Sequence, residues 1–163
     1  MVNKRDRSWD DRPAMPIPLV ACFGALLLVL TATIPGIAED LQIARVDKTT
    51  GQATVQRGAV SLPIKSGDPL YVGDVIATGA SGSIDLTFRD STTFSTGPNS
   101  ELSLRQFRFE PANSTGEMLA EVNRGTLSVM SGKLVKGSPG AMKIKTPTAV
   151  LNVRGTTFLV KVD

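Results

Sequence analysis

Carboxylates and one serine near a lysine are the side chains of this chain best suited to chemistry. Asp85 and Asp90 offer a candidate acid–base pair, and Ser131 near Lys133 has the composition of a Ser/Lys nucleophile. Plainer roles fit the local sequence better. Asp85 alternates with apolar residues on the outward side of an expected strand, and Asp90 falls in an expected turn. We therefore expect a protein that is not an enzyme.

The composition removes most other catalytic and metal chemistry. The 163 residues include no histidine and one cysteine, Cys22, which lies in an apolar run near the N-terminus. Ser/His/Asp and Cys/His sites, zinc sites built on thiolate or imidazole, and an intramolecular disulfide are thus excluded. We expect no metal and no cofactor. Aromatic residues make up only 5% of the chain, which is poor for base stacking, so nucleic acid is not an expected partner.

The N-terminus has the pattern of an export signal. A basic segment, residues 1–16, precedes an apolar run, residues 17–34, and small residues follow at Gly36 and Ala38. This order predicts a signal peptide cleaved after Ala38. Two alternatives stay open: the run is an uncleaved membrane anchor, or Cys22 is acylated as in lipoproteins.

These possibilities define the expected domains. Residues 1–38 are a signal peptide or an N-terminal membrane anchor, and residues 39–163 form one domain. Cleavage makes the body periplasmic, whereas an uncut anchor holds a periplasmic domain on the inner membrane. Contact with the membrane is then expected only through residues 17–34, if they are retained.

The body alternates apolar and polar residues with a period of two and has frequent turn signals, which predicts short β-strands. The alternating apolar sets are Val60/Leu62/Ile64, Ile84/Leu86/Phe88, Leu102/Leu104, Leu127/Val129, Met142/Ile144 and Phe158/Val160/Val162. The fold class is therefore all-β, a single domain of short strands resembling an irregular β-solenoid or β-sandwich. A change of parity predicts a bulge near Arg105 and Gln106 that keeps Phe107 and Phe109 inside. Residues 117–124 fit a helix or a strand, and we favour a strand.

Charge is divided unevenly along the body. Residues 39–123 carry 7 basic and 11 acidic side chains, whereas residues 124–163 carry 7 basic side chains against one acidic side chain. Lys143 and Lys145 share the outward side of one expected strand. They form either a solvated strand face that discourages aggregation or a surface for an anionic envelope component or acidic partner.

Two blocks of sequence together resemble the FecR domain of bacterial envelope proteins. The first contains Val72-Gly73-Asp74-Val75 to Gly79, Gly82 to Asp90 and Gly97-Pro98-Asn99; the second contains Arg124-Gly125-Thr126, Ile144 to Val150 and Val153 to Val160. From the residues, we expect Gly73, Gly79, Gly97, Gly125 and Gly155 to supply turn dihedrals, and Asp74 and Asn99 to bond their own backbone in turns. Pro147 is expected to fix an extended entry to the next strand. The charge of Arg154 is not needed by a turn, and we expect its guanidinium to bond neighbouring carbonyls rather than a ligand.

The resemblance implies an all-β, solenoid-like periplasmic fold that works by protein interaction or signalling rather than catalysis. The leading hypothesis is a stand-alone exported FecR-domain protein that binds an unidentified envelope protein or anionic envelope surface. Binding would use an edge strand or the basic C-terminal face. The alternative is a single-pass inner-membrane regulator of iron-responsive sigma-factor signalling, as in the best-known members of the family.

Overall fold

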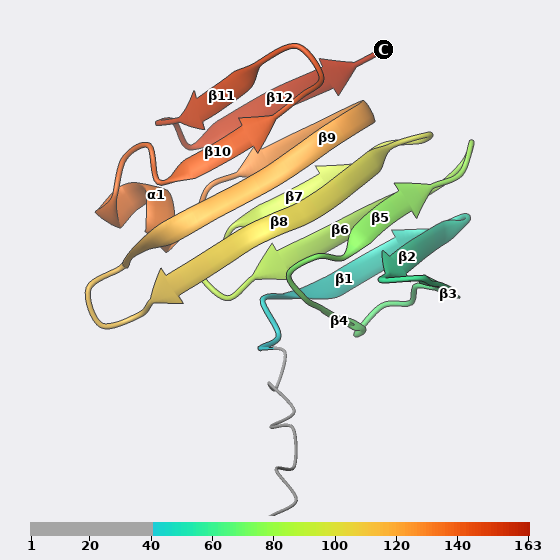
Figure 1. Ribbon diagram of the computed structural model, residues 1–163, viewed down its shortest axis with the longest axis horizontal. Coiled ribbons are helices and arrows are strands. Elements are labelled where there is room, and N and C mark those ends of the chain that lie inside the picture. Colours follow the sequence, from blue (N-terminus) through green and yellow to red (C-terminus); the bar gives the residue numbers. More distant parts are fainter. Residues whose placement is uncertain (1–40) are drawn as a thin grey trace, which may run out of the picture. The chain divides into compact units, whose positions relative to one another are not determined.

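The computed structural model describes residues 41–163, which form strands throughout except for one short helix (Figure 1). The elements are β1 (Ala44–Thr50), β2 (Ala53–Arg57), β3 (Val60–Pro63), β4 (Pro69–Leu70), β5 (Val75–Thr78), β6 (Ser83–Phe88), β7 (Thr93–Thr96), β8 (Glu101–Glu110), β9 (Thr115–Met130), α1 (Lys133–Gly137), β10 (Met142–Lys145), β11 (Val150–Val153) and β12 (Thr157–Val162). The predicted all-β class and single domain are confirmed.

The strands make one curled sheet that folds back into two layers, visible one behind the other in Figure 1. One layer runs β3-β2-β5-β8-β9-β10-β11, and the other runs β4-β1-β6-β7-β9-β12. Neighbouring strands are antiparallel except β9 and β10, which are parallel. The arrangement matches the sandwich-like form of the sequence prediction.

Strand β9 belongs to both layers and joins them. Its first half pairs with β8 and β10, and its second half pairs with β7 and β12. The change of layer falls at Gly125, where φ is +85° and the register against β8 shifts near Glu101. The sequence predicted a turn at Arg124 and Gly125, and this prediction is wrong. The glycine forms a bulge that redirects a continuous strand, because a bulge bends and twists a strand without ending it.

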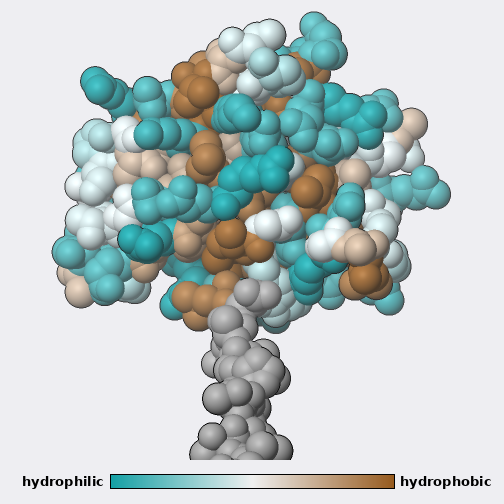
Figure 2. Space-filling view, in the orientation of Figure 1, coloured by the Kyte–Doolittle hydropathy of each residue, from teal (hydrophilic) through white to brown (hydrophobic). Residues whose placement is uncertain are grey.

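Alternate side chains of both layers fill the space between them. Leu86, Phe94, Leu104 and Ile144 are almost completely buried. Phe88 packs edge-on against Phe94, with ring centroids 4.8 Å apart. It also stacks on half-buried Phe107 at 5.4 Å, which links the layers. These contacts stabilise the sandwich through burial of apolar surface. On the outer face shown in Figure 2, hydrophilic residues are interspersed with hydrophobic ones.

Two strand predictions around β8 and β9 are confirmed. The register between β8 and β9 shifts between Leu104 and Gln106, where the bulge was expected. Residues 117–124 are part of β9 rather than a helix.

One prediction about a strand face is wrong, and one element was not predicted. Val60 and Leu62 were expected to face the core, but they are 56% and 45% exposed, because β3 is an edge strand whose four residues are all exposed. The unpredicted element is α1, which forms because Leu134 and Val135 bury their side chains beside β9.

The predicted signal peptide or anchor, residues 1–38, and the candidate lipidation site Cys22 lie outside the described residues. Within residues 41–163, no helix is long and apolar enough to span a membrane.

Candidate functional site

The first signature block surrounds a buried carboxylate that ties two strands together. Asp74 is fully buried and accepts a hydrogen bond from the backbone N–H of Tyr71 at 2.9 Å, so the predicted turn bond is confirmed. Both of its carboxylate oxygens also accept hydrogen bonds from Arg57, from Nε and Nη2 at 2.8 Å each. The guanidinium lies 4.3 Å from the centroid of the Tyr71 ring. Sequence reasoning missed Arg57 because nothing in its spacing connects it to the turn at Gly73.

Gly73 and Gly125 confirm the predicted dihedral role, with φ of +91° and +85°. Two features exclude a side chain at Gly125: its positive φ, and the close approach of Ser100, whose Cα would lie 2.5 Å from an added Cβ. Gly79, Gly97 and Gly155 do not adopt positive φ, so the same prediction is wrong for them. Gly79 is instead constrained by close approach, since an added Cβ would lie 3.2 Å from the Cβ of Gln52.

Asn99 lies in the left-handed region with φ of +51°, and its backbone N–H donates to the carbonyl of Gly79 at 3.0 Å. In the described part of the chain, the side chain of Asn99 forms no hydrogen bond to its own turn. The left-handed backbone conformation, rather than a side-chain bond, therefore accounts for an asparagine at this position. A hydroxyl cluster lies next to it. The hydroxyl of Thr78 accepts from the N–H of Ser100 at 2.9 Å, and the hydroxyl of Ser100 accepts from the N–H of Thr126 at 3.0 Å. These bonds hold the point where β9 changes layers.

Apart from Arg124-Gly125-Thr126 in β9, the second signature block lies in β10, β11, β12 and the loops that join them. The prediction that Pro147 leads an extended chain into the next strand is wrong. It occupies the tight connection between β10 and β11, where Thr146 donates to the carbonyl of Ala149 at 2.8 Å. Arg154 is exposed between β11 and β12, and within residues 41–163 its guanidinium has no hydrogen-bond or ion-pair partner. Its charge therefore faces solvent, and the expected bond to neighbouring carbonyls is not formed among the described residues.

The candidate catalytic residues have structural surroundings. Asp85 lies on the outward side of β6, as expected, whereas Asp90 is fully buried. The carboxylate of Asp90 accepts from the hydroxyl of Thr92 at 2.6 Å and from the N–H of Leu134 at 3.3 Å, so it connects the turn after β6 to α1. Ser131 donates its hydroxyl to the carbonyl of Gly155 at 2.7 Å. In the described residues, no cluster of acidic or thiol ligands is arranged for a metal.

One of the two lysines on the basic strand face has an ion-pair partner. Lys143 and Lys145 share the outward side of β10, as predicted, between buried Met142 and Ile144. Lys145, however, forms an ion pair with Glu121 at 3.0 Å.

Glu121 also binds Arg105 at 2.9 Å, so one carboxylate meets two cations. The hydrogen bond from Lys145, and then that from Arg105, hold the pKa of Glu121 below its ordinary value of 4.5. Lys145 therefore already has a charged partner within the protein.

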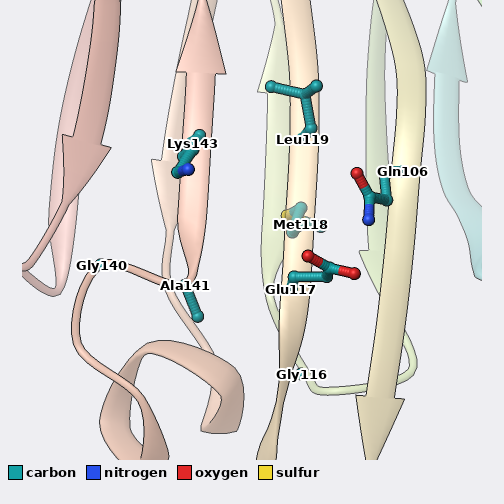
Figure 3. Close-up of a pocket in the computed structure, with 8 residues that line it drawn as sticks. All are labelled: Gln106, Gly116, Glu117, Met118, Leu119, Gly140, Ala141 and Lys143. Carbon is teal, nitrogen blue, oxygen red and sulfur yellow. The ribbon is translucent and has the colours of Figure 1, made fainter.

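A shallow hollow lies between β8, β9 and β10 on this outer face (Figure 3). Lys143 flanks it on β10, Leu119 and Glu117 lie on β9, and Gln106 extends from β8. Glu117 forms an ion pair with Arg108, with 3.9 Å between Oε1 and Nη1. Its mixed charges and exposed rim give the hollow no specific chemistry.

The two layers end side by side at β11 and β12, each of which pairs with a single neighbour. Between these edges lies a hollow of about 300 Å³ lined chiefly by Leu151, Val153, Arg154, Phe158 and Leu159. Leu159 is 68% exposed. This end offers unpaired backbone, apolar surface and one free cation together.

The fold and these sites define an all-β sandwich whose signature residues act mainly on architecture. The FecR protein family model matches residues 74–163, more than half of the chain. The chain belongs to the FecR family. A solved structure described as a cell surface anchoring domain is 34% identical, covering 37% of this chain and 82% of that chain, with a TM-score of 0.36. No curated protein matches the chain.

Proposed function

We propose that this FecR-family chain is a non-catalytic interaction module of the bacterial envelope, exported to the periplasm. One observation carries the proposal: the two layers of the sandwich end together in the open edges of β11 and β12, inside the family-matched region. Open edges present unpaired N–H and C=O groups to any extended chain that approaches them. The N-terminal export pattern in the sequence supports the location.

A catalytic role finds less support in the contacts of the candidate residues. The hydroxyl of Ser131 and the carboxylate of Asp90 are both engaged in bonds that hold loops together. A nucleophile or a general base needs a free approach to its substrate. We therefore propose that Asp90 and Ser131 stabilise the fold.

A protein partner is favoured over an anionic surface. Lys145 shares the carboxylate of Glu121 with Arg105, so the outward side of β10 retains only Lys143 as a cation without a partner among residues 41–163. One exposed cation adds little attraction at physiological salt, where the Debye length is about 8 Å. Backbone pairing along an edge is less sensitive to salt.

The test is recovery of a partner from bacterial envelopes. The full chain carrying an affinity tag is cross-linked in cells, purified from the envelope fraction, and its adducts are identified by mass spectrometry. We expect a defined envelope protein, recovered equally well from Lys143→Gln cells. Recovery of lipid or lipopolysaccharide alone, lost at high salt, would overturn the protein-partner proposal, and a cytoplasmic location would overturn export.

A further inference from the structure

We propose that β12 is the docking edge, and that it takes an extended acidic strand of a partner protein in which apolar and acidic residues alternate. This inference rests on the proposed function and specifies its site and ligand. Three features of the structure support this site: the unequal protection of the open edges, the direction of the backbone groups on β12, and the charge around them.

The four edge strands of the two layers are unequally protected. β3 has four residues and ends at Pro63, and β4 has two residues and begins at Pro69. Short length and proline both discourage pairing with another chain. β11 also has only four residues, whereas β12 has six and contains no proline. β12 is thus the longest edge, and its sequence does least to block an added strand.

The register of β12 fixes which backbone groups are available. The N–H of Ser131 donates to the carbonyl of Thr156 at 2.7 Å, and Thr157 lies opposite Met130. In an antiparallel ladder the bonding direction alternates along each strand. Phe158 and Val160 therefore direct their N–H and C=O groups to β9, and Leu159 directs its own away from β9.

The side chains of β12 define what an added strand must carry. Val160 is buried and Phe158 is half-buried against the core, while Leu159 and Lys161 are exposed on the other side. Apolar side chains of an added strand would enter the hollow between β11 and β12, beside Leu151. Apolar residues at alternate positions satisfy this side of the strand.

Charge indicates which residues the added strand should carry on its outward side. The segment 124–163 carries seven basic side chains against Asp163 alone. Arg154, at the rim of the hollow, is exposed and has no ion-pair partner within the described residues, whereas Lys161 binds Asp163 at 2.8 Å on the surface. Acidic residues on the outward side of the added strand complement this field. A second copy of the chain would instead bring the same excess of positive charge, and like charges oppose association.

The test uses synthetic peptides and the full chain kept in mild detergent. The probes are a labelled peptide of alternating valine and glutamate, the same peptide with lysine replacing glutamate, and the glutamate peptide N-methylated along one edge. Binding is followed by fluorescence anisotropy. We expect the glutamate peptide to bind, the lysine peptide to bind about tenfold more weakly or less, and the N-methylated peptide to lose binding.

Matched variants place the site. Leu159→Glu should weaken binding of the glutamate peptide about tenfold or more, because it places a negative charge beside the acidic side of the added strand. Leu62→Glu, which changes a 45% exposed leucine on edge strand β3, should leave binding unchanged. Arg154→Gln should reduce the preference for glutamate over lysine. Both leucines are exposed, so neither variant should alter the circular dichroism spectrum.

Several results would overturn the proposal. Equal binding of the glutamate and lysine peptides would contradict the charge argument, and unchanged binding by Leu159→Glu would place the site elsewhere. A dimer seen by sedimentation and abolished by Leu159→Glu would show that the edge takes a second copy. If an envelope partner is still captured by Leu159→Glu, the interaction function stands and only the β12 site is wrong. If wild-type chain captures none, the proposed function itself fails.

Discussion

The guanidinium of Arg57 holds both carboxylate oxygens of Asp74, with Nε and Nη2 each 2.8 Å from one of them. Arg57 ends β2, and Asp74 precedes β5 in the adjacent position of the same layer. The carboxylate is fully buried, while the Arg57 side chain is 40% exposed. A bidentate pair of this kind fixes geometry as well as charge.

Replacing either residue of this pair should lower the free energy of unfolding, and the two replacements should differ in size. Asp74→Ala should lower the free energy of unfolding by about 2–4 kcal/mol, because it also leaves the N–H of Tyr71 without its acceptor. Arg57→Lys should retain the charge but lose the second bond and the contact with the Tyr71 ring. Urea unfolding measures both. Equal stability of Asp74→Ala and the wild type would show that the pair is not structural.

The tripeptide Arg-Gly-Thr occurs twice, at residues 124–126 and 154–156, with different requirements for its glycine. Gly125→Ala should destabilise by more than about 2 kcal/mol, since φ is +85° and the added Cβ would meet Ser100. Gly155→Ala should change stability by less than about 0.5 kcal/mol, because its φ is not positive and no atom lies within 4 Å of an added Cβ. Thermal unfolding of the two variants compares them directly. Similar losses of stability in both variants would contradict the role of Gly125 at the point where β9 changes layers.

The free energy of unfolding should depend on pH through the carboxylate of Glu121. Its folded-state pKa lies below the ordinary 4.5, so its contribution is complete above that pH and is lost as the pH falls through the lower folded-state value. Glu121→Gln should therefore destabilise at pH 7, by about 1 kcal/mol or less because its cations Lys145 and Arg105 are each half exposed.

The difference between Glu121→Gln and the wild type should shrink below pH 4.5 and vanish once Glu121 is protonated. Urea unfolding at several pH values gives the profile. A difference that stayed constant into strong acid would mean that the carboxylate charge is not responsible.

The two carboxylates once considered as an acid–base pair should behave differently. Asp90→Ala should destabilise by about 1–3 kcal/mol, because the buried N–H of Leu134 and hydroxyl of Thr92 lose their acceptor. Asp85→Ala, on the outward side of β6, should change stability by less than about 0.5 kcal/mol. Denaturant midpoints of the two proteins check this contrast. A large loss for Asp85→Ala would show that its side chain has a role beyond solvation.

The sequence predicted the strands that are buried on one side, because alternation reports burial directly. Leu86 and Ile144 are examples, and the parity change at Gln106 revealed a bulge for the same reason. Prediction failed where position in the sheet decides the outcome. Val60 and Leu62 alternate as core residues do, but β3 lies at an edge.

The site was less predictable, because its contacts join residues distant in sequence. Glycine type alone could not distinguish Gly125 from Gly155, since the difference lies in the backbone of Ser100 that approaches only one of them. Likewise, Lys143 and Lys145 look equivalent on one strand, and only the pairing of β9 with β10 brings Glu121 to Lys145. Which edge stays open is also a property of the whole sheet.

The central claim, that the chain works by holding a partner strand at β12, is tested most directly by photo-crosslinking in living bacteria. A photoreactive amino acid replaces Leu159 in one strain and exposed Gln56, on β2, in another. The account predicts a discrete adduct with another envelope protein from position 159 and none from position 56. Adducts from position 56 alone, or an adduct of the chain with itself from position 159, would contradict it.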